Sequence, residues 1–346
     1  MDFLKHQDKL PEFLNNYLKY KNFILFNSDG TSDNAYYDLV SFFRYIKLKF
    51  YNEELLNTVN KDDFKEVDIK DITLDDMSRV TEDDIDKYIS FLSNVLGNKT
   101  STRNKKISAT KKFFKHLSNN NLFPDNLSQN TEYGRTEKRL PKYLNLEESK
   151  ILLSKTINSI EVYKIRNYAM ICIFLNCALR VSELINIDIP DIKLDEGTIR
   201  ITGKGDKQRI LYLDEAVKDA IKEYMKVRQV IGYDNVDRNA LFLSSRNKRI
   251  SRRTVEHIVT EKLNECFEDK KGLHTHSLRH SSASMMHNIN NTDIVILKKC
   301  LGHLSIAATQ NYTHIDSKKL RYIMDNCTIS SILEKQIKEE KSYGKW

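Results

Sequence analysis

The chain has 346 residues, of which 40% are hydrophobic and 30% charged, and it carries a formal net charge of +8. This composition can bury a core and excludes wholesale disorder. No run of about 18 apolar residues without charges occurs, which excludes a membrane-spanning helix. The length predicts two or three domains.

The cysteines and the start of the chain bear on the cellular compartment. The five cysteines form no C-x-x-C pair, which argues against a disulfide framework and against a cysteine-ligated zinc site. Residues 1–13 carry charges throughout, unlike a secretory signal. We therefore expect a cytoplasmic protein.

The charge is distributed unevenly along the chain. Residues 50–86 hold 13 acidic and 4 basic residues, a local charge of −9, so the remainder of the chain carries +17. A basic body favours a polyanionic partner, either nucleic acid or an anionic membrane surface. A solvated surface that promotes solubility is the alternative.

The first half of the chain reads as a small helical domain. Apolar residues at helical spacing predict helices over 10–26 and 34–50, with a loop at 27–34 between them. Thr81 is a candidate N-cap, and the acidic residues after it suit the start of a helix that Gly97 would end.

Residues 100–117 form the next predicted helix, which is basic on its exposed face. Such a face can lie against a phosphate backbone, although an ordinary solvated face is the alternative. The basic residues that we assign to DNA on this helix are Arg103, Lys105, Lys106, Lys111 and Lys112, and Lys115 accompanies them.

Residues 118–142 lack periodicity and are rich in Asn, Ser, Pro and Gly, as interdomain linkers are. We place a first domain at 1–130, a linker at 131–141 and a second domain at 142–346.

The second domain is predicted to be mainly helical with a small sheet. A helix opens near residue 144, and a nearly all-apolar helix follows over 161–179. The alternating segments 198–202 and 209–213 flank a glycine-bearing turn and predict an antiparallel hairpin. Helices are expected from residue 214 to the end of the chain.

Two segments place a cation at a structural junction. Arg180 directly follows the apolar helix in NCALRVSEL, where its charge must reach solvent or a fixed anion; Glu183 could be that partner. Lys204 lies between two glycines in GKGDKQR, and glycines let a backbone approach a ligand closely. The turn is no Walker P-loop, and taken alone it is better explained as an ordinary exposed turn.

Two further segments carry histidines. In LHTHSLRHSSAS, His276 and Arg279 share one helix face; the spacing of His276 and His280 also permits zinc, although the arginine disfavours a divalent cation. In CLGHLSIAATQNYTHI, His303 follows a glycine and Tyr312 comes nine residues later.

Together these motifs resemble a known family. The set R-x-S-E-L, G-K-G-x-K-x-R, H-x-L-R-H, L-G-H and Y-T-H, in this order over about 141–320, is similar to the tyrosine recombinase (phage integrase) family. The resemblance implies a mainly α fold: an N-terminal helical core-binding (SAM-like) domain, then an α-rich catalytic domain with a small antiparallel β-sheet. The implied activity is cutting and rejoining of DNA through a covalent 3′-phosphotyrosyl intermediate.

The resemblance also implies a role for each catalytic residue. Arg180 and Arg279 would hold the scissile phosphate, and Lys204 would protonate the leaving 5′-oxygen. His276 would be an acid or base near the nucleophile, His303 would hydrogen-bond the phosphate, and Tyr312 would attack it. Glu183 and His280 occupy supporting positions of the motifs. Because cationic side chains supply the electrostatics and the phosphotyrosine conserves the bond energy, no metal, ATP or other cofactor is expected.

The same resemblance implies partners. These are a double-stranded DNA recombination site, a homotetramer on that DNA or an assembly with a second recombinase, and a DNA-translocase activator, with no membrane involved. The tail 317–346 would dock into a neighbouring protomer or pack on its own domain. A second basic run completes the expected DNA contacts, with Arg246, Lys248, Arg249, Arg252 and Arg253.

Several functions stay open from the sequence. A Xer-like recombinase would resolve chromosome or plasmid dimers for chromosome partition at cell division. An integrase or transposase of a phage or conjugative element is the alternative within the family. Outside it stand a non-catalytic DNA-binding module, a type IB topoisomerase, and a metal-dependent nuclease built on His274, His276 and His280.

Overall fold

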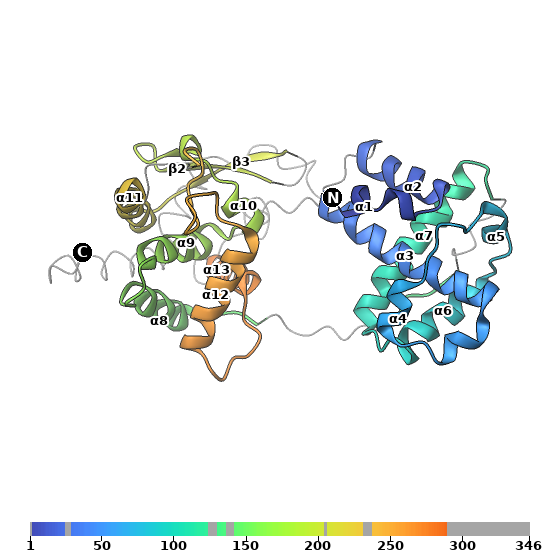
Figure 1. Ribbon diagram of the computed structural model, residues 1–346. Helices are drawn as coiled ribbons and strands as arrows, with labels where there is room; N and C mark the ends of the chain where they lie inside the picture. Colours follow the sequence, from blue (N-terminus) through green and yellow to red (C-terminus); the bar gives the residue numbers. More distant parts are fainter. Residues whose placement is uncertain are drawn as a thin grey trace. The chain divides into compact units, whose positions relative to one another are not determined.

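A computed structural model describes residues 2–24, 29–123, 130–135, 142–203, 206–230 and 237–288 of the chain. The chain divides into two compact units, residues 1–139 and 140–346 (Figure 1). Each unit has its own hydrophobic core. The predictions for Lys204, His303, Tyr312 and the tail 317–346 concern residues outside the described part.

Every regular element in the described part of the first unit is a helix. Its elements are α1 (Asp2–Lys5), η1 (Gln7–Lys9), α2 (Glu12–Lys19), η2 (Tyr20–Ile24), α3 (Asp29–Tyr51), η3 (Glu53–Asn57), α4 (Lys61–Glu66), α5 (Leu74–Ser78), α6 (Glu82–Asn94) and α7 (Thr100–Asn119).

Aromatic side chains fill the core between α3 and α7. Phe42 and Phe43 of α3 and Phe113 and Phe114 of α7 are fully buried. Phe42 meets Phe114, and Phe43 meets Phe113, in edge-to-face contacts with ring centroids 5.9 and 5.5 Å apart. This geometry places the positive edge of one ring against the negative face of the next. The apolar face of α7 is therefore fixed, and its basic residues are confined to the remaining faces.

The acidic segment 50–86 supplies helix caps. The Asp76 and Asp84 carboxylates accept hydrogen bonds of 2.9 Å from the backbone N–H groups of Thr73 and Thr81, which complete capping boxes at α5 and α6. Asp84 also pairs with Lys49. The predicted cap at Thr81 is confirmed, and Gly97 follows the helix with a positive φ of 59°. Part of the local negative charge is thus used inside the fold.

Two predictions in the first unit were wrong in detail. The helix expected over 10–26 divides into α2 and the π-helical turn η2. The helix expected from residue 34 begins at Asp29, so most of the predicted loop 27–34 is helical. Asp, Ser and Thr are favoured both in loops and at helix starts, which is why composition could not separate these two states.

The second unit contains helices and one small sheet. Its elements are α8 (Leu146–Ile157), α9 (Lys164–Cys177), α10 (Val181–Ile185), η4 (Ile189–Asp191), β1 (Ile192–Lys193), β2 (Thr198–Thr202), β3 (Gln208–Tyr212), α11 (Glu215–Val230), α12 (Arg252–Cys266) and α13 (Thr275–Asn288). The mainly helical fold with a small antiparallel sheet is confirmed.

The sheet has the order β1-β2-β3, and all its pairs are antiparallel. The predicted hairpin is confirmed as β2 and β3, with Ile199 opposite Leu211 and Ile201 opposite Arg209. Ile199 and Ile201 are buried, whereas Arg200 between them is exposed, as the alternation of a strand requires. The sequence analysis did not predict the short edge strand β1.

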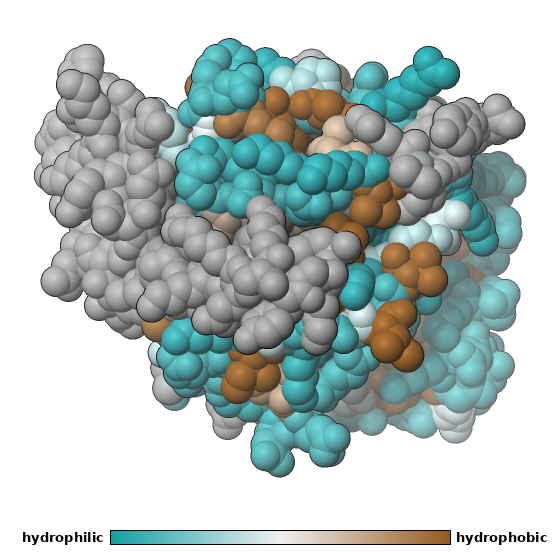
Figure 2. Space-filling model, turned by 90° about the vertical axis from the view of Figure 1, so that its left-hand side faces the viewer, coloured by the Kyte–Doolittle hydropathy of each residue, from teal (hydrophilic) through white to brown (hydrophobic). Residues whose placement is uncertain are grey.

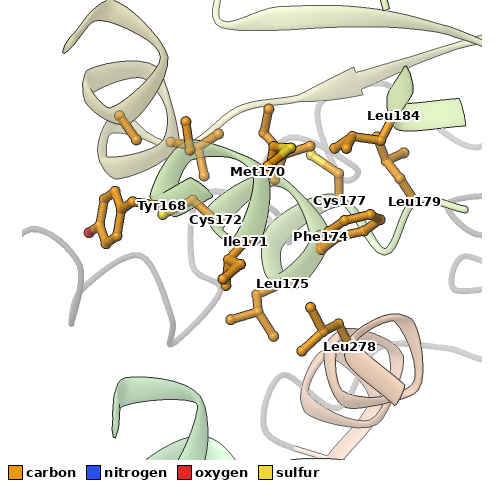
Figure 3. Close-up of a cluster of buried hydrophobic side chains, with 14 of the residues drawn as sticks. Tyr168, Met170, Ile171, Cys172, Phe174, Leu175, Cys177, Leu179, Leu184 and Leu278 are labelled. Atoms are coloured by element: carbon orange, nitrogen blue, oxygen red, sulfur yellow. The ribbon is translucent and has the colours of Figure 1, made fainter. Parts of the chain in front are cut away.

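Helix α9 is the centre of the second core. It is buried on every side, and α8, α11 and α13 pack against it. Figure 3 shows its apolar side chains spreading around the helix, with Leu175 directed toward Leu278 of α13. The helix ends at Cys177, and Ala178 takes a left-handed conformation with φ of 50°. That turn redirects the chain, so that Arg180 starts α10 beside the core.

Residues 237–250 are not helical, so the prediction of helices from 214 onward was wrong there. An isolated bridge between Asp188 and Ala240 connects this segment to the residues after α10, and a second one pairs Leu243 with Arg249 inside the segment. The buried Arg228 guanidinium donates to the carbonyls of Ala240 and Leu241 at 2.7 and 3.1 Å. A buried arginine can thereby replace the backbone partners that a helix would have provided.

Where the surface in Figure 2 is coloured, hydrophilic residues cover most of it and hydrophobic residues form patches among them. Among the described residues, no helix is long and apolar enough to cross a membrane. Of the large hydrophobic residues in the described part of the chain, Ile160 and Val162 are the most exposed. Glu161 between them pairs with the buried Lys262 and accepts a 3.1 Å hydrogen bond from Asn167, which holds this loop in place.

Candidate active site

Arg180 lies at the N-cap of α10, in extended conformation. Its backbone N–H donates to Glu183 Oε2 at 2.8 Å, and its Nη1 donates to Glu183 Oε1 at 2.9 Å. The side chain is 35% exposed, so the guanidinium has one side on the protein and one toward solvent. The two interpretations of Arg180 are therefore compatible. Glu183 orients the guanidinium, and the solvent-facing side of the guanidinium can still contact an anion.

Glu183 is buried and lies at the centre of a cluster of three arginines. Arg209 of β3 donates to both of its carboxylate oxygens, with Nη1–Oε1 and Nη2–Oε2 distances of 3.0 Å each. Nη1 of Arg279 lies 3.7 Å from Oε2. Burial alone would raise the pKa of Glu183, but the bonds from Arg209 and Arg180 outweigh it and hold this pKa below its ordinary value.

Arg279 reaches the same cluster from α13. Its side chain is buried, and Nη1 donates to the carbonyl oxygen of Ala178 at 2.5 Å. Burial and the positive charge of Arg180 lower the pKa of Arg279 to about 10. The left-handed turn at Ala178 thus serves two purposes: it presents Arg180 and it binds Arg279. Two arginines about a hundred residues apart in sequence converge here.

Among the described residues the three guanidiniums share the Glu183 carboxylate, which gives these four residues, Arg180, Arg209, Arg279 and Glu183, a net charge of +2. We call these four residues the arginine cluster. Uncompensated buried positive charge is unfavourable by itself and becomes favourable when an anion enters. Forked guanidinium donors match the geometry of a phosphate. The cluster therefore combines the excess positive charge and the forked donors that a phosphate-binding site requires.

His276 lies one helical turn before Arg279 and is exposed. Desolvation, followed by the charges of His274, His280, Arg279 and Arg180, lowers its pKa below the ordinary histidine value. The imidazole is therefore neutral near pH 7 and able to accept a proton. His276 is therefore near enough to the arginine cluster for the charges of Arg279 and Arg180 to affect its pKa.

His274 lies directly before α13, and His276 and His280 lie on it; the three are not arranged as a metal site. The ring centroid of His276 lies 6.2 Å from that of His274 and 6.3 Å from that of His280. Within the described part of the chain, no group of three or more His, Cys, Asp or Glu residues is arranged to hold a metal ion.

Lys204 lies outside the described residues, but Gly203 before it does not. A Cβ atom on Gly203 would lie 3.6 Å from Glu183 Oε1 and 3.6 Å from Arg209 Nη1. The N–H of Gly203 donates to the Lys207 carbonyl at 2.8 Å, which closes the base of the turn. The described end of the hairpin therefore lies at the arginine cluster.

The predicted DNA-contacting residues of α7 fall into two groups. Arg103, Lys106 and Lys111 are bound within their own unit: Arg103 to Ser93 and Thr100, Lys106 to Asp38 at 3.4 Å, and Lys111 to the Thr131 carbonyl at 2.7 Å. The others point outward and recur at helical spacing; they are Lys105, Lys112 and Lys115.

The second basic run divides in the same way. Arg249 donates to Asp188 at 2.5 Å and to the Ile185 carbonyl at 2.9 Å, so it holds the segment before α12 against α10. Arg252 pairs with Glu256 at 2.8 Å on the surface. The remaining residues of the run are exposed; they are Arg246, Lys248 and Arg253.

Arg209 is the residue of the cluster that the sequence analysis did not assign. It is the last residue of GKGDKQR, a motif that was noted for its lysine. Strand alternation places Arg209 on the face opposite Ile210, and Ile210 is exposed. A cation predicted on the buried face of a strand was the available signal, because such a residue needs an acidic partner.

Comparison with known proteins gives consistent matches. Residues 142–319 match the phage integrase family. Tyrosine recombinase XerC of Caldanaerobacter subterraneus subsp. tengcongensis is 39% identical over 95% of this chain and 89% of its own length. Tyrosine recombinase XerD of Proteus mirabilis is 30% identical over 66% of this chain and 72% of its own.

Solved structures agree in fold. A XerH site-specific recombinase bound to its difH substrate aligns with a TM-score of 0.55 and 26% identity, covering 71% of this chain and 70% of that one. A lambda integrase dimer bound to a core site aligns with a TM-score of 0.59 at 14% identity, covering 88% and 98%. The chain belongs to the phage integrase family of tyrosine recombinases, enzymes that carry out DNA strand exchange.

Proposed function

We propose that this chain is a Xer-like site-specific recombinase that resolves chromosome or plasmid dimers. The observation that carries the chemistry is the convergence of Arg180 and Arg279 on one buried glutamate. The 39% identity to a XerC over 95% of the chain supports the biological role. Its partners are then a double-stranded recombination site, further copies of the chain or a second recombinase in a tetramer, and a DNA-translocating activator, all in the cytoplasm.

In this mechanism Tyr312 attacks the scissile phosphorus, and the bond to the 5′-oxygen breaks as the 3′-phosphotyrosyl bond forms. Arg180 and Arg279 offset the charge that develops on the phosphoryl oxygens in the transition state. His276, neutral near pH 7, accepts the phenolic proton, and Lys204 donates one to the departing oxygen. His303 hydrogen-bonds the phosphate. Religation reverses these steps with a different 5′-hydroxyl, so the sequence of bonds needs no external energy source.

DNA binding is assigned to both units. We propose residues 1–130 as the core-binding domain, 131–141 as the linker and 142–346 as the catalytic domain with its tail. The outward lysines of α7 (Lys105, Lys112 and Lys115) are the strongest candidates for phosphate contacts in the first unit, because they carry exposed charge along one helix face. Arg246, Lys248 and Arg253 are their counterparts in the second unit.

A nicked suicide duplex tests the function. The site is first mapped by capture of covalent adducts on genomic DNA, and a duplex is then made with a nick beside the cleavage position, so that religation is prevented. Wild-type protein should form a covalent complex that resists denaturant, with or without a chelator. Tyr312→Phe should form none. If wild type forms no adduct, or Tyr312→Phe forms as much, the proposed chemistry is wrong.

The biological role needs a separate test. A plasmid carrying two directly repeated copies of the mapped site should resolve into two circles in the presence of the protein. A site that maps to the border of a mobile element, rather than to one chromosomal locus, would indicate an integrase.

A further inference from the structure

Arg209 forms more side-chain hydrogen bonds to Glu183 than either arginine of the proposed phosphate clamp. Both of its Nη atoms donate to the carboxylate at 3.0 Å, whereas Arg180 donates through one Nη and Arg279 lies at 3.7 Å. Its side chain is 16% exposed, about half the exposure of Arg180. Arg209 is therefore directed at the carboxylate rather than at solvent.

The charges explain what this arrangement achieves. A carboxylate facing only Arg180 and Arg279 would neutralise one of the two guanidiniums that must face a phosphate. A bidentate arginine is the strongest partner available to a carboxylate, because both N–H···O bonds are parallel and charge-assisted. With Arg209 in place, the arginine cluster carries +2; without it, the same cluster would carry +1.

We propose that Arg209 is a positioning residue of the recombinase: it binds the Glu183 carboxylate and so keeps the charge of Arg180 and Arg279 available to the scissile phosphate. The proposal rests on the proposed function, since it assumes that these two arginines hold the phosphate. Arg209 acts through Glu183 and is not assigned a contact with DNA.

Strand geometry supports this division of labour. Arg209 pairs with Ile201 in the hairpin and is anchored by the β2–β3 ladder. Glu183 in turn caps α10 through the backbone N–H of Arg180 at 2.8 Å. The carboxylate thus has two tasks, capping a helix and orienting Arg180. Arg209 offsets its charge without disturbing either task.

A second-site rescue experiment on the nicked suicide duplex tests the proposal. Arg209→Gln lowers the charge of the cluster and should slow covalent complex formation by about 10- to 100-fold, less than the loss of a direct transition-state donor. Adding Glu183→Gln removes the uncompensated carboxylate and restores the charge. The double variant should therefore react about 3- to 10-fold faster than Arg209→Gln alone, a rescue within the range of measured pairwise couplings.

Two single variants complete the design. Arg209→Lys keeps the charge but not the bidentate geometry, and it should react faster than Arg209→Gln. Arg200→Gln is the matched control, because Arg200 lies on β2 of the same hairpin and pairs with Asp191 at 2.8 Å on the surface. Its rate should stay within about 2-fold of wild type, as expected for an exposed pair. Circular dichroism shows whether each variant is folded. If Arg209→Gln is not folded, the proposal is tested by comparing the rates of Arg209→Lys and of the double variant with the wild-type rate.

The outcomes separate the two proposals. A double variant slower than Arg209→Gln, or an Arg209→Gln rate equal to wild type, overturns the role of Arg209 and leaves the recombinase function standing. Equal rates for Arg209→Lys and Arg209→Gln overturn it as well, because charge would then not matter. Absence of any adduct with wild-type protein refutes the recombinase function, and the role of Arg209 falls with it.

Discussion

Replacing Glu183 by glutamine should destabilise the second unit markedly, although the two side chains have almost the same shape. The change removes one negative charge from a buried position that accepts three side-chain bonds from Arg180 and Arg209. It also converts one acceptor oxygen into an NH₂ group that faces arginine donors. Glu183→Gln thus isolates the contribution of the charge.

The magnitude follows from the burial of the partners. Removing one partner of a fully buried ion pair costs about 3–5 kcal/mol. Arg180 is 35% exposed and can recover solvation, whereas Arg279 and Arg209 are 6% and 16% exposed and cannot recover much. We therefore expect a loss of about 2–4 kcal/mol in the free energy of unfolding at pH 7.

A urea titration followed by far-UV circular dichroism measures this loss, with Glu196→Gln as the control. Glu196 also pairs with a basic residue three positions away, Lys193 at 2.9 Å, but both side chains are exposed. That variant should change the free energy of unfolding by less than about 0.5 kcal/mol. Equal stabilities of the two variants would refute our account of the arginine cluster.

The pH dependence provides a second test of the same reasoning. Because the pKa of Glu183 is lowered in the folded protein, its carboxylate stabilises the fold above the pKa of the unfolded chain. That stabilisation disappears as the pH falls through the folded pKa. The difference between wild type and Glu183→Gln should therefore be constant near neutrality and shrink in acid. A difference that grows in acid would have the wrong sign.

Three further predictions follow from contacts in the two units. Lys112→Ala should make the negative slope of log K for DNA against log salt smaller in magnitude by about 0.9, the value for one lost phosphate contact. Lys106→Ala should leave that slope unchanged and lower the free energy of unfolding by about 1–2 kcal/mol, because Lys106 binds Asp38. Equal slopes for both variants would contradict this. The pKa of His276, measured by NMR titration of the free protein, should lie below the ordinary value and rise in Arg180→Ala, and an unchanged pKa would show that the two residues do not interact. Leu278→Ala should lower the free energy of unfolding by about 2–5 kcal/mol through a cavity between α13 and α9, which a urea titration would detect; a smaller loss would mean that the core closes around the gap.

Much of the helical fold could be predicted from the sequence, because it depends on signals that are local. The Thr81 cap, the basic helix α7 and the β2–β3 hairpin each follow from a few neighbouring residues. The left-handed residue Ala178 and the irregular segment 237–250 could not be predicted in this way. Each is held by an arginine outside the local segment: Arg279, about a hundred residues from Ala178, and Arg228, 12 residues before Ala240. Tertiary contacts override local propensity at such places.

The site shows the same division between local and distant information. The family resemblance grouped Arg180, His276 and Arg279, and the structure brings Arg180 and Arg279 to the same carboxylate. The sequence could not show that one carboxylate contacts several of the arginines, because an ion pair with Arg180 alone was enough to explain Glu183. Which basic residues of α7 are exposed was also hidden, since Lys106 and Lys112 differ only in the neighbours that folding gives them.

Each of the two units contains a carboxylate that lies among several basic side chains. Asp38 near Lys106 and Glu183 near Arg209 each lie among several cations and are largely shielded from solvent. Burial raises the pKa of Asp38 above its ordinary value in spite of Lys106, whereas at Glu183 hydrogen bonds from arginine outweigh burial and lower it. The difference lies in geometry: a bidentate guanidinium and a backbone N–H bind Glu183, and an ammonium group at 3.4 Å binds Asp38. Glu183 therefore stays charged across the neutral range and holds Arg180 in place. A lysine in place of Arg209 would lack the bidentate geometry and would lower the pKa of Glu183 less.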